Sequence, residues 1–228
     1  MSYDLALVLP VQNQAEIINS VVNKIVKILT KAKINYQLIM AENGSTDNTL
    51  TVLKKMAKKN HRIKLITSLP GYGRAVITGL KAADGKYLGY MPSDGQCDAT
   101  VLTKVFEAAR KKSVDLVKVY RTSRESRLRK YISKVFNCLA NLFFNLKVKD
   151  INASPTVFAA EKLQQLKLKS PDSFLDTELL IKARRFNWKI VRIPMRNFNR
   201  SGGKSTVKPA IVFEFVRNII QWRWHEQL

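Results

Sequence analysis

Acidic residues are scarce in this chain. Its 228 residues include 40 lysines and arginines but only 17 aspartates and glutamates, for a formal net charge of +23. A field of that sign attracts nucleic acid, anionic lipid headgroups or phosphorylated substrates. A merely solubilising surface is the alternative explanation. The charge imbalance therefore favours an anionic ligand, but it does not distinguish nucleic acid, lipid headgroups and phosphorylated substrates.

Cysteine and long apolar stretches are also scarce. Cys97 and Cys138 form neither a CxxC pair nor a Cys/His metal spacing, which indicates free thiols in a reducing compartment. No segment reaches the roughly 18 to 20 uncharged apolar residues of a membrane-spanning helix. Asp4 interrupts the N-terminus where a signal peptide would be apolar. We therefore expect a cytoplasmic protein that meets a membrane, if at all, as a peripheral protein on its cytoplasmic face.

The chain does contain a regular alternation of strand and helix patterns. Short apolar runs typical of buried strands alternate with longer segments in which apolar residues recur at the helical period. This alternation predicts an α/β fold with a mainly parallel central sheet flanked by helices. The strand patterns cover residues 5–11, 36–41, 63–67 and 87–91, and the helical patterns cover 15–31, 50–59 and the segment from the glycine loop at 70–74 to residue 83.

Polar residues follow several of these predicted strands. The strand at 87–91 ends at Pro92, which lacks an N–H, and Asp94 and Gln96 come directly after it. Ligands in open α/β sheets bind beyond the carboxyl ends of strands, but an ordinary surface turn uses the same residues. Glu42 ends the second strand, where nucleotide-binding folds place an acid against a ribose or base. A charge that merely ends a strand is equally common.

The glycine loop is not a dinucleotide-binding motif. Gly71 and Gly73 do not continue as GxGxxG, because Val76 stands at the third glycine position. A dehydrogenase of the Rossmann type is therefore disfavoured. The loop can still bring backbone N–H groups and Arg74 near a phosphate at a helix N-terminus.

Four blocks of sequence together resemble the family 2 glycosyltransferases. They are Leu-Pro-Val-Gln-Asn, Glu-Asn-Gly-Ser-Thr-Asp-Asn-Thr, Gly-Tyr-Gly-Arg-Ala and Met-Pro-Ser-Asp-Gly-Gln, in the family's order and spacing. Within the family, the chain looks most similar to the dolichyl- and polyprenyl-phosphate sugar transferases, such as the dolichol-phosphate mannose synthases. The resemblance implies a GT-A-type nucleotide-sugar-binding fold over residues 1–207. The pattern of apolar residues indicates an amphipathic C-terminal tail over 208–228.

The resemblance implies roles for the residues that match family motifs. Asp94 matches the second acid of a D-x-D metal motif and Gln96 the glutamine after it, so both are implied ligands of Mg²⁺ or Mn²⁺. Pro92 stands where the first acid belongs. One carboxylate can be sufficient to bind the metal when diphosphate oxygens and water complete its coordination. The alternative is that the chain is a metal-independent or inactive relative of the family. The implied nucleotide-sugar contacts are Pro10, Glu42, Gly73, Arg74, Ser93, Arg200, Lys204 and Ser205.

The segment 121–149 combines cations with a wide apolar face that bears phenylalanines. This pattern is typical of an amphipathic helix at a membrane interface, although a core helix with a solvated face fits it too. Nucleic-acid binding is not expected, because the sequence shows neither aromatic side chains placed to stack on bases nor the motifs of a known nucleic-acid-binding fold. In the resembled family Arg121 and Arg129 are implied to grip a phosphate of acceptor or donor. Asp150 is either a catalytic carboxylate, like Asp94, or a strand-end acid paired with the many bases.

Two C-terminal features complete the resemblance. Residues 200–205 resemble the family's mobile basic loop, whose two glycines would let it close as a lid, and a plain solvated loop is the alternative. The tail places tryptophans beside arginines, which suits a lipid headgroup region. A dimer contact or a helix folded back on the core fits the tail equally well.

The implied reaction is the inverting transfer of one sugar from a GDP- or UDP-linked donor to a polyprenyl phosphate. An ionised phosphate acceptor needs no strong general base, whereas a hydroxyl acceptor does. A membrane surface or a membrane protein is then an expected partner. The alternatives are transfer to a glycan hydroxyl, and a non-catalytic protein that binds a nucleotide sugar or an anionic polymer.

Overall fold

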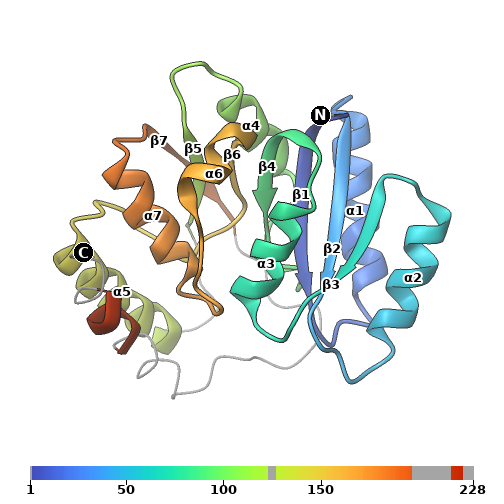
Figure 1. Cartoon of the computed structure of the whole chain (residues 1–228), viewed down its shortest axis with the longest axis horizontal. Coiled ribbons are helices and arrows are strands. Elements are labelled where there is room, and N and C mark those ends of the chain that lie inside the picture. The colour runs from blue at the N-terminus through green and yellow to red at the C-terminus, as the bar shows by residue number, and fades with distance from the viewer. Residues whose placement is uncertain (1, 123–126, 197–216, 223–228) are drawn as a thin grey trace.

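The computed structural model describes residues 2–122, 127–196 and 217–222 (Figure 1). The first half alternates strand and helix as the sequence predicts, with boundaries within a few residues of the predicted ones. Its elements are β1 (Tyr3–Val11), α1 (Ile18–Lys31), β2 (Tyr36–Glu42), α2 (Thr49–Lys59), β3 (Ile63–Thr67), α3 (Tyr72–Lys81) and β4 (Gly85–Tyr90).

The second half is less regular. It contains two strands, β5 and β6, that the sequence patterns did not identify. Its elements are α4 (Val101–Ala109), β5 (Leu116–Arg121), α5 (Arg127–Phe144), β6 (Thr156–Ala159), a 3₁₀ turn (Ala160–Lys162), α6 (Leu163–Leu166), α7 (Leu175–Arg185) and β7 (Ile190–Met195).

The described strands form one seven-stranded sheet in the order β3-β2-β1-β4-β6-β5-β7. Strand β6 runs antiparallel to its neighbours β4 and β5, and all other pairs are parallel. The expected mainly parallel α/β fold is therefore confirmed. Because β4 and β5 both oppose β6, they run in the same direction as β1 and β2. The carboxyl ends of these four strands meet at one edge of the sheet, which we call the carboxyl edge.

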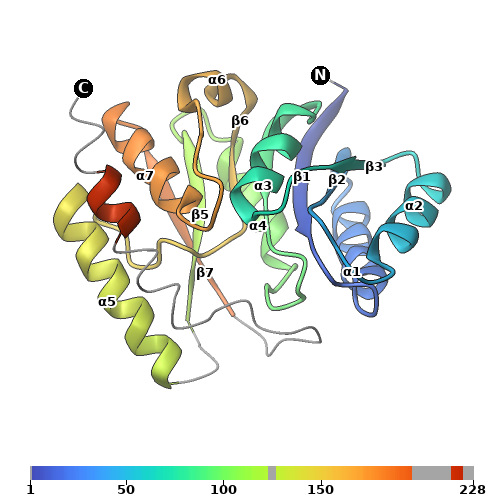
Figure 2. The same ribbon diagram turned by 60° about the horizontal axis from the view of Figure 1, so that its bottom comes forward.

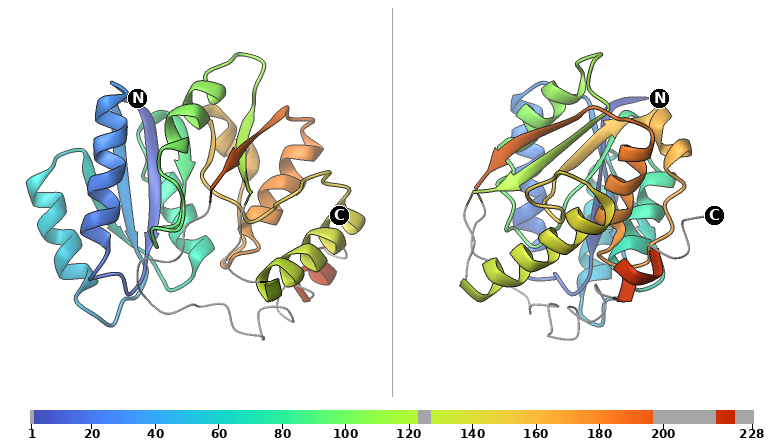
Figure 3. Two further views of the ribbon diagram at one scale, coloured as in Figure 1. Left: turned by 180° about the vertical axis from the view of Figure 1, so that it is seen from behind. Right: turned by 90° about the vertical axis from the view of Figure 1, so that its left-hand side faces the viewer.

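Helices cover both faces of the sheet (Figures 1 and 3). Side chains alternate in β1, so Leu5, Leu7 and Leu9 pack on the face covered by α1, α2 and α4. Ala6 and Val8 lie on the other face, with α3, α5 and α7. Strand β1 is buried on both faces, which explains its continuous apolar run.

The helical residues 217–222 pack on the core beside α7 (Figure 2). Trp222 lies with its ring centroid 5.8 Å from that of Phe174, and the Lys182 ammonium is 5.4 Å from the Trp222 ring. The Asn218 side-chain amide donates to Asp172 Oδ2 at 2.9 Å. The tail could bind lipid headgroups, form a dimer contact or fold back on the core. Residues 217–222 match the last of these three interpretations.

None of the described helices combines the length and the apolar character that crossing a bilayer requires.

Candidate functional site

Glu42 is fixed at the tip of β2. Its side chain is 6% exposed, and its carboxylate accepts a hydrogen bond from the Ser45 backbone N–H at 2.5 Å. The chain turns at Gly44, whose φ of 84° favours glycine. The Asn43 side-chain amide donates to the Val11 carbonyl at 3.1 Å and so ties the tips of β1 and β2 together. Glu42 is therefore an ordered acid at the carboxyl edge.

The loop after β4 is tied to the other side of β1. The buried Ser93 hydroxyl donates to the Pro10 carbonyl at 2.8 Å, and the Asp94 carboxylate accepts from the Gln96 N–H at 3.1 Å. Strand β1 lies between β2 and β4. Glu42 and Asp94 thus leave the same edge of the sheet from strands on either side of β1, together with Pro10 and Ser93.

Arg121 and Asp150 form a fork-to-fork ion pair at the end of β5. Arg121 donates from Nε to Asp150 Oδ2 at 2.8 Å, from Nη2 to Oδ1 at 2.7 Å and from its backbone N–H to Oδ2 at 3.1 Å. Burial acts to lower the pKa of the guanidinium, but hydrogen bonds and charge from Asp150 raise it above its ordinary value. Asp150 is 4% exposed and orients Arg121, which matches the interpretation of a strand-end acid paired with a base.

Cys97 connects the β4 loop with the end of β5. Its thiol donates to the Ser154 carbonyl at 3.2 Å. The pKa of this thiol is raised to about 12, first by burial and then by the Asp94 charge, while the Arg121 charge opposes the shift. Asp94 and Arg121 are thus close enough for both charges to act on one sulfur atom. Asp94 and Arg121 are thus near one another at the carboxyl edge, and Glu42 leaves the same edge from β2.

A buried polar cluster lies beneath this region. The Lys118 ammonium donates to Asp176 Oδ1 at 2.7 Å and to the Thr156 hydroxyl at 3.1 Å, and the Tyr90 hydroxyl donates to the same Asp176 oxygen at 2.8 Å. All four side chains are buried. The cluster joins β4, β5, β6 and α7 directly behind the strand tips. Sequence reasoning missed it, although a single lysine inside the apolar run Leu-Val-Lys-Val is the signal that could have revealed it.

Gly73 and Arg74 have contacts within the protein. A Cβ on Gly73 would lie 2.1 Å from the Ser170 carbonyl oxygen, so only glycine lets α3 meet the loop 170–172. The Arg74 N–H donates to the Pro171 carbonyl at 3.2 Å, and its exposed guanidinium donates to the Pro70 carbonyl at 2.8 Å. The glycine therefore has a packing reason that is independent of any phosphate.

Four predicted contacts lie partly or wholly outside the described residues. The backbone of Arg129 belongs to α5, but its side chain is not among those that the structure describes. Arg200, Lys204 and Ser205 all fall within the undescribed segment 197–216. Their predicted roles stay predictions.

The donor set at the β4 loop suits a hard divalent ion. Within the described part of the chain, no three histidine, cysteine or acidic side chains gather as a metal cluster. Asp94 and Gln96 nevertheless offer a carboxylate and an amide oxygen from one loop, and both residues are half-buried. Mg²⁺ is commonly held by one or two carboxylates together with substrate phosphates and water. The residues present fit an ion that arrives with a diphosphate.

Comparisons with known proteins agree with this geometry. The family described as Glycosyl transferase family 2 matches residues 6–166. Glycosyltransferase AglD of Haloferax volcanii is 27% identical over 84% of this chain and 32% of its own length. Dodecaprenyl-phosphate galacturonate synthase of Rhizobium johnstonii is 24% identical over 73% of this chain and 51% of its own length. This chain thus spans about a third and about half of these two relatives. An uncharacterized glycosyltransferase of Mycobacterium bovis is 27% identical over 96% of both chains.

Solved structures show the same fold. Glucosyl-3-phosphoglycerate synthase from Mycobacterium tuberculosis in complex with UDP has a TM-score of 0.76 at 16% identity, covering 97% of this chain and 80% of that one. The same enzyme with Mn²⁺, UDP-glucose and phosphoglyceric acid has a TM-score of 0.75 at 17% identity, covering 97% and 80%. Since the family match spans well over half of the sequence, this chain belongs to glycosyltransferase family 2.

Proposed function

We propose that the chain transfers one sugar, with inversion, from a nucleoside diphosphate donor to a polyprenyl phosphate at a membrane surface. One observation supports this most directly. The tips of β2, β4 and β5 carry Glu42, Asp94 and Arg121, and all three leave the carboxyl edge of the sheet. Such a transfer needs an acid that binds the nucleoside, a carboxylate that binds the metal on the diphosphate, and a cation that binds a second phosphate.

The donor lies across β1 in this proposal. Glu42 accepts hydrogen bonds from the ribose or base, as strand-end acids do in nucleotide-binding folds. Asp94 and Gln96 hold Mg²⁺ or Mn²⁺, which when bound neutralises charge on the departing diphosphate. Ser93, fixed to the Pro10 carbonyl, holds this loop against β1.

The acceptor phosphate binds at Arg121 in this proposal. Asp150 holds the guanidinium by two side-chain hydrogen bonds, so little side-chain entropy remains to be lost when a phosphate binds. Asp150 and Asp176 are both engaged by a cation, which makes them poor general bases. A phosphate acceptor is already ionised at neutral pH and needs no such base. The relative that acts as a dodecaprenyl-phosphate galacturonate synthase supports the same acceptor class.

The exposed face of α5 supports a location at a membrane surface. Tyr131, Val135, Cys138 and Leu142 recur at helical spacing and are all exposed, and Leu142 is 75% exposed. Helix α5 begins six residues after Arg121, since 127 − 121 = 6. An apolar stripe beside basic residues suits an interface with anionic lipid, which agrees with a peripheral position on the cytoplasmic face.

Transfer of label into lipid tests the proposal. The full chain is incubated with radiolabelled UDP- and GDP-sugars, polyprenyl phosphate and Mn²⁺, and the mixture is extracted with organic solvent. We expect label in the lipid phase. Label that appears only in a water-soluble glycan would favour the hydroxyl acceptor, and nucleotide binding without any transfer would favour a non-catalytic binder. Either result would overturn the proposed reaction.

A further inference from the structure

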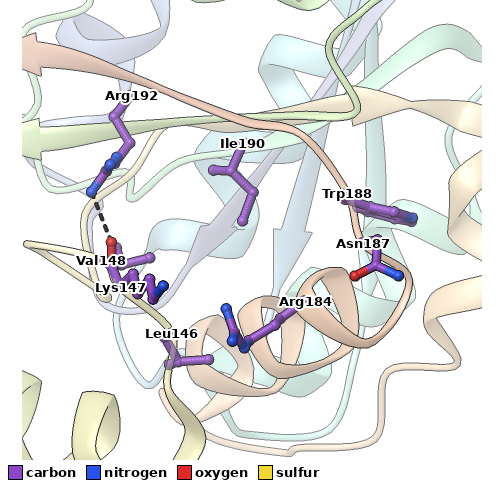
Figure 4. A pocket seen from close by; sticks show the side chains of 8 residues that line it. All are labelled: Leu146, Lys147, Val148, Arg184, Asn187, Trp188, Ile190 and Arg192. Atoms are coloured by element: carbon purple, nitrogen blue, oxygen red, sulfur yellow. Dashed lines mark hydrogen bonds between the residues drawn. The ribbon is translucent and has the colours of Figure 1, made fainter.

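A pocket of about 310 Å³ lies beside the first residues of β7. Three segments line it: the loop 146–148 after α5, the C-terminal end of α7, and the start of β7 (Figure 4). Ile190 pairs with Leu116 at the beginning of β5, whereas Met195 pairs with Arg121 at its end. Five residues of strand separate these two levels, or roughly 16 Å at the usual rise. The pocket is therefore separate from the proposed nucleotide-sugar site.

The charged side chains that line the pocket are all cationic. They are Lys147, Arg184 and Arg192, each from a different lining segment, and no carboxylate lines the hollow. In Figure 4 the guanidinium groups of Arg184 and Arg192 point toward the loop that carries Lys147. Three like charges around one hollow repel one another, and a bound anion relieves that repulsion.

The side chains of these three cations are exposed, and they differ in their partners from buried or half-buried cations of the chain. Lys118, Arg121 and Lys182 each form an ion pair with a carboxylate. In the described ranges no carboxylate pairs with Lys147, Arg184 or Arg192. No carboxylate of the described residues thus neutralises the donors that line the pocket.

The pocket also has features that hold the donors in place. Arg192 donates from Nη1 to the Lys147 carbonyl at 2.9 Å, which fixes its guanidinium at the wall and leaves further N–H groups for a ligand. Asn187, with a φ of 54°, adds a side-chain amide at the end of α7. Trp188 is 8% exposed and gives the pocket a rigid apolar wall. Guanidinium forks and an amide are the groups that recognise phosphate oxygens.

We propose that this pocket is a second anion site that binds a phosphate group. The phosphate can come from an anionic lipid headgroup or from a soluble phosphate ester, since both present the same oxygens. The inference is independent of the proposed sugar transfer, because it involves none of the residues at the carboxyl edge.

A titration of the full chain without any nucleotide sugar tests the proposal. Inorganic phosphate is added while NMR follows the Asn187 side-chain amide, which all variants retain, and also the Arg184 and Arg192 Nε–H signals in the parent and the control. We expect a saturable shift that weakens about tenfold or more in the double variant Arg184→Gln/Arg192→Gln. The matched control is Arg185→Gln/Lys189→Gln, which removes two charges from the same end of α7 and the residue before β7 without touching the lining. This control should bind phosphate within about twofold of the parent.

A second arm distinguishes the two phosphate sources. Flotation with phosphatidylglycerol vesicles is compared with phosphatidylcholine vesicles for the same variants. Loss of phosphatidylglycerol binding in the lining variant alone identifies a lipid headgroup, and a phosphate response without any such loss identifies a soluble ester. Absence of a saturable phosphate shift, or equal weakening in the lining and control variants, would overturn the proposal.

Discussion

At the scale of single residues, Asp94 is the side chain on which the donor end of the proposed reaction depends. Asp94→Asn keeps the size of the side chain but removes the charge that would hold a divalent ion. We expect kcat to fall by about 10²-fold or more, because an unscreened diphosphate is a poor leaving group. Transfer rates at increasing Mn²⁺ concentrations measure the effect.

The same loop supplies a matched control for this substitution. Asp98→Asn changes an acid four residues on, whose carboxylate accepts hydrogen bonds from the Thr100 N–H and hydroxyl at the start of α4. Its activity should stay near that of the parent. Equal activity of the Asp94→Asn variant and the parent would remove Asp94 from the metal site.

The two cysteines should react very differently with alkylating agents. Burial raises the pKa of Cys97 to about 12, whereas Cys138 lies exposed on α5. Iodoacetamide attacks thiolates, so Cys138 should be alkylated at pH 8 while Cys97 stays unmodified in the folded protein. Mass spectrometry of each peptide measures this, and rapid labelling of Cys97 without unfolding would contradict its raised pKa.

The Cys97 shift also sets a pH dependence of stability. The folded-state pKa lies above the ordinary value of 9.0. The stabilisation linked to this thiol is therefore fully present below about pH 9 and is lost as pH rises from about 9 to 12. In Cys97→Ala, the free energy of unfolding should fall less steeply over that range, which urea titrations at several pH values can measure.

At the scale of elements, the buried Lys118–Asp176 pair holds three strands and α7 behind the site. Lys118→Met leaves Asp176 buried with an uncompensated charge, so we expect the free energy of unfolding to fall by about 3–5 kcal/mol. Lys86→Met is the matched control, because Lys86 pairs with Asp4 at 3.0 Å while its side chain is 62% exposed. That change should cost less than about 1 kcal/mol. Similar losses in both variants, measured by urea unfolding, would contradict the role of the cluster.

Sequence patterns identified the elements whose apolar residues are continuous or periodic. They missed β5, because Lys118 interrupts its apolar run, and only the folded chain shows that Asp176 neutralises this lysine. They also missed β6, whose four residues are too short for a clear pattern. Predictions were most accurate for strands buried along their length, as in β1 and β2.

The parts of the site that depend on distant segments could not be predicted from local sequence. Arg121 and Asp150 are 29 residues apart, and only the fold shows that they form an ion pair. The family resemblance implies that Gly73 contacts a nucleotide sugar, yet a Cβ at this position would collide with the Ser170 carbonyl nearly one hundred residues later. Such contacts are set by tertiary packing, which carries no local sequence signature.

At the scale of the whole molecule, the net charge and the apolar stripe on α5 together favour an anionic membrane surface. Leu142→Asp places a carboxylate in that stripe, and we expect weaker flotation with phosphatidylglycerol vesicles at low salt. Leu69→Asp is the matched control, because Leu69 is 71% exposed compared with 75% for Leu142 but follows β3 instead of lying on α5. Equal loss of vesicle binding in both variants would show that charge alone, and not the stripe, governs the association.

The arrangement of the carboxyl edge is tested most directly by a crystal structure of the chain with UDP or GDP and Mn²⁺. We expect the diphosphate and the metal at Asp94 and Gln96, and the nucleoside beside Glu42 on the other side of β1. A nucleotide that binds elsewhere, with neither carboxylate in contact, would contradict the proposed site.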